Sequence, residues 1–365
     1  MSENRKIPLS LTIALALIVA LAGCADQNTQ SVRTFLAAAD KPPVQDMLPC
    51  QLALAAELPY RIVSSHMVLD ASINGQPATF IFDTGAFKTV LMPEAAARLG
   101  LKRQRGSIAP IIGIGGMRQA AMYEARTLHI GTLHGEKWHF IVADLGLSAF
   151  NPPVDGSLGA DILWQYDIDI DVPDSKVVLY GPQHDCSKPS VFLNQPLYGV
   201  PLEKPFRFVP SPRAPAFIKA FFALSPPVEA SPRIRVMIAG KPIVAEIDSG
   251  APHSVLFLGA ASRLGLTGDQ LGRDPGFLAH GIGPGAVPAR RHVIPPITIG
   301  ELEISNLPVA VLPQDYTKGV DMILGLDLLS RVHAWVSHSS GNFIMQYPPA
   351  SSPTLPVLPT TLATH

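Results

Sequence analysis

The sequence predicts an all-β protein built from two similar lobes. Its 36 prolines and 29 glycines are set among short Val/Ile/Leu runs, which favours many turns between strands over a helical bundle. At 365 residues and 47% hydrophobic content, the chain is long enough to bury two cores of ordinary size. The stretch IFDTGAFKTVLMPEAAARLGL, which begins at Ile81, is also closely matched by IDSGAPHSVLFLGAASRLGL, which begins at Ile247. We therefore expect a duplicated β domain.

The repeat extends well beyond this stretch. At the spacing that separates Asp83 from Asp248, many residues of the first copy meet their own type in the second: Gly75, Pro77, Gly85, Ala86, Val90, Leu91, Ala96, Arg98, Leu99, Gly100 and Leu101. Further along, IIGIGG (111–116) is matched by HGIGPG (280–285), and LGADIL (158–163) by LGLDLL (324–329). Matched order and spacing indicate an internal duplication.

Composition shifts divide the rest of the chain. The predicted order is a signal peptide (1–24), a polar tether (25–54), the first lobe (55–182), a Pro-rich linker (183–214), the second lobe (215–347) and a disordered tail (348–365).

The N-terminus resembles a bacterial lipoprotein signal peptide. Arg5 and Lys6 precede an apolar run (7–22), and LAGC ends it at Cys24. The resemblance implies cleavage before Cys24, lipidation of that residue, and a protein held at the cell envelope by its lipid and facing the periplasm. An uncleaved transmembrane anchor is the alternative.

Two further cysteines, Cys50 and Cys186, flank the first lobe. In an oxidising compartment they are expected to form a disulfide, although two separate thiols are the alternative, because the sequence gives no distance between them.

Each copy begins with the pattern of a β-hairpin. INGQPATFIFD and IAGKPIVAEID each read as strand, tight turn and strand, with the turns at Asn74-Gly75 and Ala239-Gly240. After the Asp, a short helix is expected in each copy, ended by Gly100 in the first and by Gly265 in the second.

The stretch YDIDIDVPDSKVVLY alternates Asp with Ile, which predicts a strand with one solvated face. It resembles the start of a calcium-binding loop, but the Gly and the closing Glu that such a loop needs are missing.

The motifs together resemble the bacterial branch of the retropepsin-like aspartic proteases. The resemblance rests on DTGA (83–86), DSGA (248–251), the glycine-rich segments, and the apolar-Gly-x-Asp segments around Gly159 and Gly325. It implies two pseudo-symmetric acid-protease β-barrel lobes with a cleft between them that takes a peptide or protein substrate. No cofactor is implied.

The resemblance assigns Asp83 and Asp248 as the catalytic dyad of an aspartic endopeptidase. Hydrolysis by paired carboxylates needs one ionised and one protonated side chain facing the same water, and two carboxyls in contact share a proton. Retroviral members obtain the second Asp by dimerising, whereas this chain carries both, so a monomer is expected.

The resemblance also assigns supporting roles. The residues expected to brace the two Asp loops are Thr84, Gly85, Ala86, Ser249, Gly250 and Ala251. The residues expected in two mobile, substrate-binding flaps are Ile112, Gly113, Ile114, Gly115, Gly116, Gly281, Ile282, Gly283 and Gly285.

Three residues depart from the family pattern. Ser157 stands where an apolar residue is usual, Pro284 interrupts the second glycine-rich turn, and Glu246 lies two residues before Asp248, where the first copy has Ile81. On a strand, Glu246 shares the face of the aspartate, where it either perturbs the dyad or is solvated or salt-bridged at an edge.

The residue after each motif glycine is Ala86 in one copy and Ala251 in the other, and an alanine side chain cannot donate a hydrogen bond to the dyad. We therefore expect the active, singly protonated pair to persist to mildly acidic or near-neutral pH.

Other functions fit less well. The net charge of −1 and the lack of a basic stripe argue against nucleic acid as a partner. His129, His134 and His139 have a spacing that suits neither one helix face nor one strand face, so we expect hairpin positions and no metal site. The alternative to an enzyme is an envelope lipoprotein that binds peptides on a retired protease fold.

Overall fold

The computed structural model describes residues 52–113, 116–182, 189, 192, 196–204, 231–281, 285–313 and 319–347, without the side chains of 110, 112 and 116–118. The signal peptide, Cys24, Cys50, Cys186, Ile114, Gly115, Ile282, Gly283, Pro284, most of the linker and the tail lie outside this part of the chain. Within it, no helix is long and apolar enough to cross a membrane.

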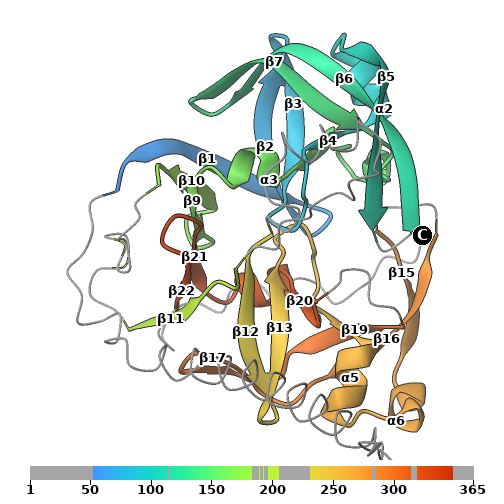
Figure 1. Ribbon diagram of the computed structural model, residues 1–365, viewed down its shortest axis with the longest axis vertical. Helices are drawn as coiled ribbons and strands as arrows, with labels where there is room; N and C mark the ends of the chain where they lie inside the picture. The colour runs from blue at the N-terminus through green and yellow to red at the C-terminus, as the bar shows by residue number, and fades with distance from the viewer. Residues whose placement is uncertain are drawn as a thin grey trace, which may run out of the picture. The chain divides into compact units, whose positions relative to one another are not determined.

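The prediction of an all-β protein with two lobes is confirmed, and Figure 1 shows the two sets of strands. The elements of the first lobe are β1 (Leu54–Val63), β2 (His66–Ile73), β3 (Gln76–Phe82), β4 (Val90–Leu91), α2 (Pro93–Arg98), β5 (Lys102–Gly113), β6 (Gly116–Ile130), β7 (Leu133–Val142), η2 (Leu147–Ala149), β8 (Gly156–Leu158), α3 (Ala160–Leu163), β9 (Asp167–Asp171) and β10 (Lys176–Tyr180).

The elements of the second lobe are β11 (Leu197–Pro201), β12 (Arg233–Ile238), β13 (Lys241–Ile247), β14 (Val255–Phe257), α5 (Leu258–Leu264), α6 (Gly268–Arg273), β15 (Gly276–Ala279), β16 (Val287–Val293), β17 (Ile297–Ile299), β18 (Leu302–Ile304), β19 (Pro308–Leu312), β20 (Met322–Leu324), α7 (Leu326–Leu329), β21 (His333–Ser337) and β22 (Asn342–Gln346).

The two lobes repeat one strand order. The first runs β5-β6-β7-β4-β8-β3-β2, and the second runs β15-β16-β19-β14-β20-β13-β12. Directions repeat as well, because β3 pairs parallel with β8 as β13 does with β20, and β4 pairs parallel with β7 as β14 does with β19. The duplication seen in the sequence is therefore a duplication of topology.

The sheet of the first lobe continues from β2 to β1 and on through the order β1-β10-β9-β21-β22-β11, which joins the two lobes. Its central pairing is between lobes, since Ile168 and Ile170 of β9 lie opposite Val336 and Ala334 of β21. Strand β11 falls within the segment predicted as a linker; it pairs with β22 along its whole length and so belongs to this joint sheet.

The prediction of a solvated face on β9 is wrong. Asp167 is fully buried and Asp169 is 2% exposed. The side chain and amide of Ser339 donate to Asp167, and His333 pairs with Asp169 at 2.6 Å, so residues from the second lobe supply the partners that water was expected to supply.

The two predicted hairpin turns are present, because Asn74 and Ala239 have φ of 54° and 49° and are followed by Gly75 and Gly240 with φ of 78° and 72°. Both central residues at positive φ match the type I′ turn, whose twist suits a β-hairpin. The short helices α2 and α5 also end where expected, each followed by a glycine in the left-handed region.

The core fixes the strands that carry the Asp loops. Phe80 and Phe82 on β3, and Ala245 and Ile247 on β13, are each at most 1% exposed. Burying an aromatic or large aliphatic side chain contributes roughly 1.5–3 kcal/mol to stability. Each Asp loop therefore starts from the rigid end of a buried strand.

Candidate active site

Asp83 and Asp248 lie at equivalent places in the two lobes. Each follows directly after a buried strand, β3 or β13. The amide of Asp83 donates to the carbonyl of Leu158 at 3.2 Å, and the amide of Asp248 donates to that of Leu324 at 3.0 Å. The neighbouring strands β8 and β20 thus hold each aspartate backbone in place.

The two carboxyl groups meet at the junction of the lobes. A Cβ built on Gly85 would lie 2.4 Å from Cγ of Asp248, and one built on Gly250 would lie 2.3 Å from Cγ of Asp83. Each carboxyl is therefore close enough to act on the pKa of the other. Because any larger residue would overlap the opposite carboxyl, glycine is required at both positions for the aspartates to come together.

Thr84 and Ser249 link the two Asp loops. The hydroxyl of Thr84 donates to the carbonyl of Ile247 at 2.7 Å, and the hydroxyl of Ser249 donates to the carbonyl of Phe82 at 2.9 Å. Each hydroxyl also accepts from the other residue's amide. Both residues are buried, so these bonds form without competition from water.

Backbone amides bind one oxygen of each carboxyl. The amides of Gly85 and Ala86 donate to Oδ1 of Asp83 at 3.1 and 2.8 Å. The amides of Gly250 and Ala251 donate to Oδ1 of Asp248 at 2.8 and 3.1 Å. The methyl groups of the two alanines add no donor to these.

Ser157 supplies a donor that the sequence did not locate. Its hydroxyl donates to Oδ2 of Asp83 at 2.6 Å, and the residue is 3% exposed. The departure from the family pattern at this position was visible in the sequence, but the contact depends on β8 lying parallel to β3, which places Ser157 opposite Ile81.

Glu246 is buried on the same strand as Asp248, at 7% exposure. It accepts a hydrogen bond from the hydroxyl of Ser231 at 2.8 Å, and its Oε2 lies 3.4 Å from Nε of Arg233. Of the alternatives left open by the sequence, a solvated side chain is therefore wrong and an ion-paired side chain is right.

The protonation of the pair is shaped by burial. Burial raises the pKa of Asp83, and the Ser157 hydroxyl and the Ala86 amide offset part of this rise. Burial also raises the pKa of Asp248 well above its ordinary value, and the charges of Asp83 and Glu246 raise it further. Such a pair holds one shared proton over a wide range of pH.

The second glycine motif stabilises each Asp loop from behind, a role that the sequence did not reveal. Asp161 accepts from the amide and the hydroxyl of Thr89 at 2.8 and 2.7 Å. Asp327 accepts from the amide and the hydroxyl of Ser254 at 2.9 and 2.6 Å. Burial raises the pKa of both carboxyls. The sequence feature that could have predicted this role is the Asp of each apolar-Gly-x-Asp segment, because a carboxyl in an apolar stretch needs a hydrogen-bond partner when it is buried.

His66 is a further neighbour of the dyad that sequence reasoning missed. Its ring packs against Phe150 with centroids 5.1 Å apart, and its Nδ1 lies 2.7 Å from the carbonyl oxygen of Ser64. Burial lowers its pKa, and the charge of Asp83 acts in the opposite direction. No motif marks this position, because it opens β2 far upstream of Asp83.

The predicted flap residues that the structure describes lie at the ends of two hairpins, β5–β6 and β15–β16. Gly113 and Gly116 pair at the end of the long β5–β6 hairpin, and Ile112 lies on β5 just before it. Gly281 and Gly285 lie beyond the last pairing of β15 with β16, which joins Ala279 to Val287. The remaining flap positions are outside the described residues.

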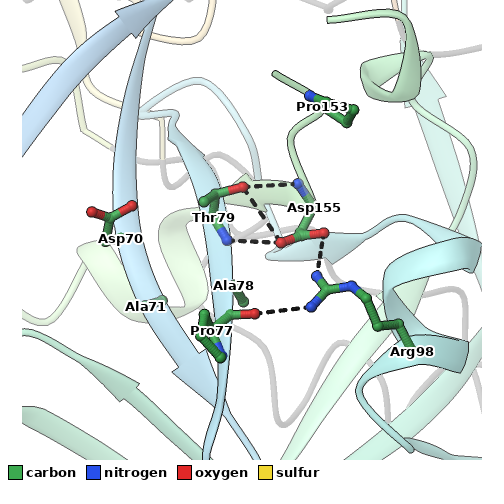
Figure 2. A pocket seen from close by; sticks show the side chains of 8 residues that line it. All are labelled: Asp70, Ala71, Pro77, Ala78, Thr79, Arg98, Pro153 and Asp155. Carbon is green, nitrogen blue, oxygen red and sulfur yellow. Dashed lines mark hydrogen bonds and ion pairs between the residues drawn. The ribbon is translucent and has the colours of Figure 1, made fainter. Parts of the chain in front are cut away.

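A pocket lined in part by Pro77, Thr79, Arg98 and Asp155 contains contacts that stabilise the fold. Figure 2 shows Arg98, at the end of α2, bridging the carbonyl of Pro77 and Asp155, while Asp155 also binds Thr79. The second lobe repeats the ion pair as Arg263 with Asp321. Because the ion pair occurs in both lobes, we infer that it holds each short helix against its sheet.

The histidines considered for a metal occupy the β6–β7 hairpin. His129 lies opposite His134, and His139 lies 3.4 Å from Glu124. Among the described residues, no group of three or more His, Cys, Asp or Glu side chains is arranged to hold a metal ion.

Comparison with known families fits this geometry. The family described as aspartyl protease matches twice, at residues 69–162 and 234–328, and each match contains one aspartate of the dyad and its second glycine motif. A search of curated proteins found no match. The two matches together cover just over half of the chain, which therefore belongs to the aspartyl protease family and contains that family's domain twice.

Proposed function

We propose that the protein is an aspartic endopeptidase that hydrolyses peptide bonds with Asp83 and Asp248 on a single chain. The observation that carries this proposal is the meeting of two half-buried carboxyls, each seated against the opposite lobe's motif glycine. A site that only gripped peptides would have no use for two carboxyls that share a proton in this geometry.

In the proposed reaction the ionised carboxyl takes a proton from a water, and the water oxygen bonds to the scissile carbonyl carbon. The protonated carboxyl gives its proton to the carbonyl oxygen, which forms a neutral tetrahedral diol. The C–N bond then breaks. The base gives the proton it had taken to the nitrogen, which leaves as an amine, and one diol hydroxyl returns its proton to the other carboxylate, which leaves a carboxylic acid product and the starting pair. The Asp loops hold both carboxyls in the required orientation throughout.

We propose that the substrate is an extended segment of a peptide or unfolded protein lying in a cleft between the lobes. The hairpins β5–β6 and β15–β16 are the elements suited to cover it, since a strand-like peptide can add main-chain hydrogen bonds to a hairpin.

We also propose that the protein is an exported, monomeric lipoprotein anchored through Cys24, with a disulfide between Cys50 and Cys186. These proposals rest on the sequence alone. Labelling of Cys24 by a radioactive fatty acid in cells, lost in Cys24→Ala, tests the anchor, while non-reducing peptide mapping tests the disulfide.

The test of the enzyme is digestion of a denatured protein mixture by the purified full chain, with and without a statine-type peptide inhibitor. We expect inhibitor-sensitive cleavage that is lost in both Asp83→Asn and Asp248→Asn. If the wild type binds the statine-type inhibitor but cleaves nothing at any pH, the peptide-binding alternative replaces this proposal.

A further inference from the structure

The two lobes differ at one pair of facing positions beneath the dyad. In the first lobe, β2 and β3 place Val68 opposite Ile81, and both are buried. In the second lobe, the equivalent register places Arg233 opposite Glu246, also buried. An apolar pair on one side is thus an ion pair on the other.

The next strand shows the opposite difference. Ser157 on β8 lies opposite Ile81, and the equivalent register on β20 places Ile323 opposite Glu246. Within the pairs β3–β8 and β13–β20, each lobe therefore has one polar and one apolar side chain, but the positions are exchanged. The pseudo-symmetry of the backbone does not extend to the environment of the two aspartates.

Because Ser157 stands where the second lobe has Ile323, Asp83 has a hydrogen-bond donor that Asp248 lacks at the equivalent position. The Ser157 hydroxyl donates to Oδ2 of Asp83 at 2.6 Å, which is a short, charge-assisted distance for a bond to a carboxylate. The side chain of Ile323 has no polar atom to offer Asp248. A hydrogen bond to the ionised form stabilises that form, so Ser157 favours negative charge on Asp83.

Glu246 acts on Asp248 as well as on Asp83. It lies two residues before Asp248, and its charge raises the pKa of Asp248. Burial raises the pKa of Glu246, and Arg233 and Ser231, which hold its side chain in place, offset part of this rise. When Glu246 is ionised, its negative charge makes it costly for Asp248 to ionise as well.

Few charged groups among the described residues act on the pKa values of Asp83 and Asp248. Those acting on Asp83 are Asp248, Glu246 and His66. Those acting on Asp248 are Asp83 and Glu246, and Arg233 acts on Glu246. When charged, His66 adds to the effect of Ser157, because it favours the ionised form of Asp83.

We propose that Ser157 is a positioning residue that makes Asp83 the ionised base of the dyad, and that Glu246 keeps the shared proton on Asp248. In the proposed hydrolysis, Asp83 then takes the proton from water, and Asp248 gives its proton to the scissile carbonyl oxygen. Asp83 finally passes its new proton to the leaving nitrogen, and one hydroxyl of the diol returns a proton to Asp248, which restores the starting state. The roles are fixed by the protein before substrate binds.

The direct test is a carbon NMR titration of the full chain labelled with ¹³C at the Asp side-chain carboxyls, with signals assigned from Asp83→Asn and Asp248→Asn. We expect Asp83 to ionise in the lower step and Asp248 in the higher one. Ionisation of Asp248 first would overturn the proposal.

Ser157→Ala should raise the lower step by about one pH unit, the size expected for loss of a hydrogen bond to a charged group. Ser157→Thr keeps the hydroxyl and should restore the wild-type step. The matched control is Ser262→Ala, which removes an exposed hydroxyl from α5. An unchanged lower step in Ser157→Ala, or an equal shift in Ser262→Ala, would overturn the role of Ser157.

The role of Glu246 is tested by giving the second lobe the pair found in the first, Arg233→Val with Glu246→Ile. This double variant removes the charges of Arg233 and Glu246 together, so that neither of the two is left buried without the other. We expect the higher step to fall, because the negative charge beneath Asp248 is gone. A higher step that does not fall contradicts this role.

The inference rests on the proposed function, but the two can fail separately. The titration needs no turnover, so a chain that cleaves nothing still reports which aspartate holds the proton. In an active chain, Ser157→Ala should also move the acidic limb of the kcat/KM profile to higher pH. A fall in kcat/KM without that movement would show a purely structural serine.

Discussion

Thr84 and Ser249 each donate a backbone amide to the other's side-chain hydroxyl, at 3.1 and 3.0 Å. Their hydroxyls in turn donate to backbone carbonyls of the opposite lobe. The exchange is symmetric and buried, so it fixes the two Asp loops relative to each other. The relative position of Asp83 and Asp248 therefore depends on side chains that take no part in the proposed reaction.

Thr84→Ala should weaken this link. It removes a hydroxyl that donates to Ile247 and leaves the amide of Ser249 buried without its acceptor. We expect the free energy of unfolding to fall by about 2 kcal/mol, measured by urea denaturation, together with a loss of activity. Thr84→Ser, which keeps the hydroxyl, is the control, and equal destabilisation by both variants would contradict this role.

The joint sheet between the lobes should be sensitive to pH through His333. Its pair with Asp169 raises the pKa of His333 despite burial. A histidine with a raised pKa in the folded state stabilises the protein fully below its unfolded value of about 6.5, and this contribution is lost as pH rises through the folded value.

His333→Gln should therefore lower the free energy of unfolding at about pH 5 and have a smaller effect at about pH 8. Urea denaturation at several pH values measures the difference. His134→Gln, on the exposed β6–β7 hairpin, is the control. A His333→Gln effect that does not shrink as pH rises would show that the charge of His333 is not what stabilises the sheet.

The buried aspartates of β9 show what the sequence could and could not predict. Alternation of Asp with Ile identified the strand, because alternation is a local property. It could not reveal the second lobe's His333 and Ser339, which lie far along the chain and bury Asp167 and Asp169.

At the dyad, too, the sequence predicted local features and not contacts between distant segments. The DxGA motifs located the two aspartates, and the spacing of the repeats predicted the duplicated topology. The contacts of Ser157 and Glu246 depend on strand register between segments that are distant in sequence. Sequence therefore marked these residues as unusual without showing what they touch.

The turn at Ala239 offers a stabilising substitution. Its φ of 49° is in the left-handed region, where an alanine costs roughly 1 kcal/mol and an asparagine less. The equivalent residue in the first lobe is Asn74. Ala239→Asn should raise the free energy of unfolding by up to about 1 kcal/mol, and a thermal or urea melt measures it. A lower stability would mean that the turn is not strained by alanine.

The pH profile of activity should be mildly acidic to near neutral, because burial and mutual repulsion raise the pKa of Asp248. Replacing both Ala86 and Ala251 with Ser adds hydroxyls that can donate to the ionised pair. We expect the basic limb of the kcat/KM profile to move to lower pH. Optimal activity of the wild type in strong acid, or an unmoved basic limb in the double variant, would contradict the role given to the alanines.

Hydrolysis in water enriched with ¹⁸O tests the central claim most directly. The purified full chain is incubated with a denatured protein mixture between about pH 4 and about pH 8, and the products are analysed by mass spectrometry. We predict internal cleavage with one labelled oxygen in each newly formed C-terminal carboxyl, and no cleavage in Asp83→Asn or in Asp248→Asn. Cleavage that persists in either variant, or a wild type that cleaves nothing across this range, would contradict the account.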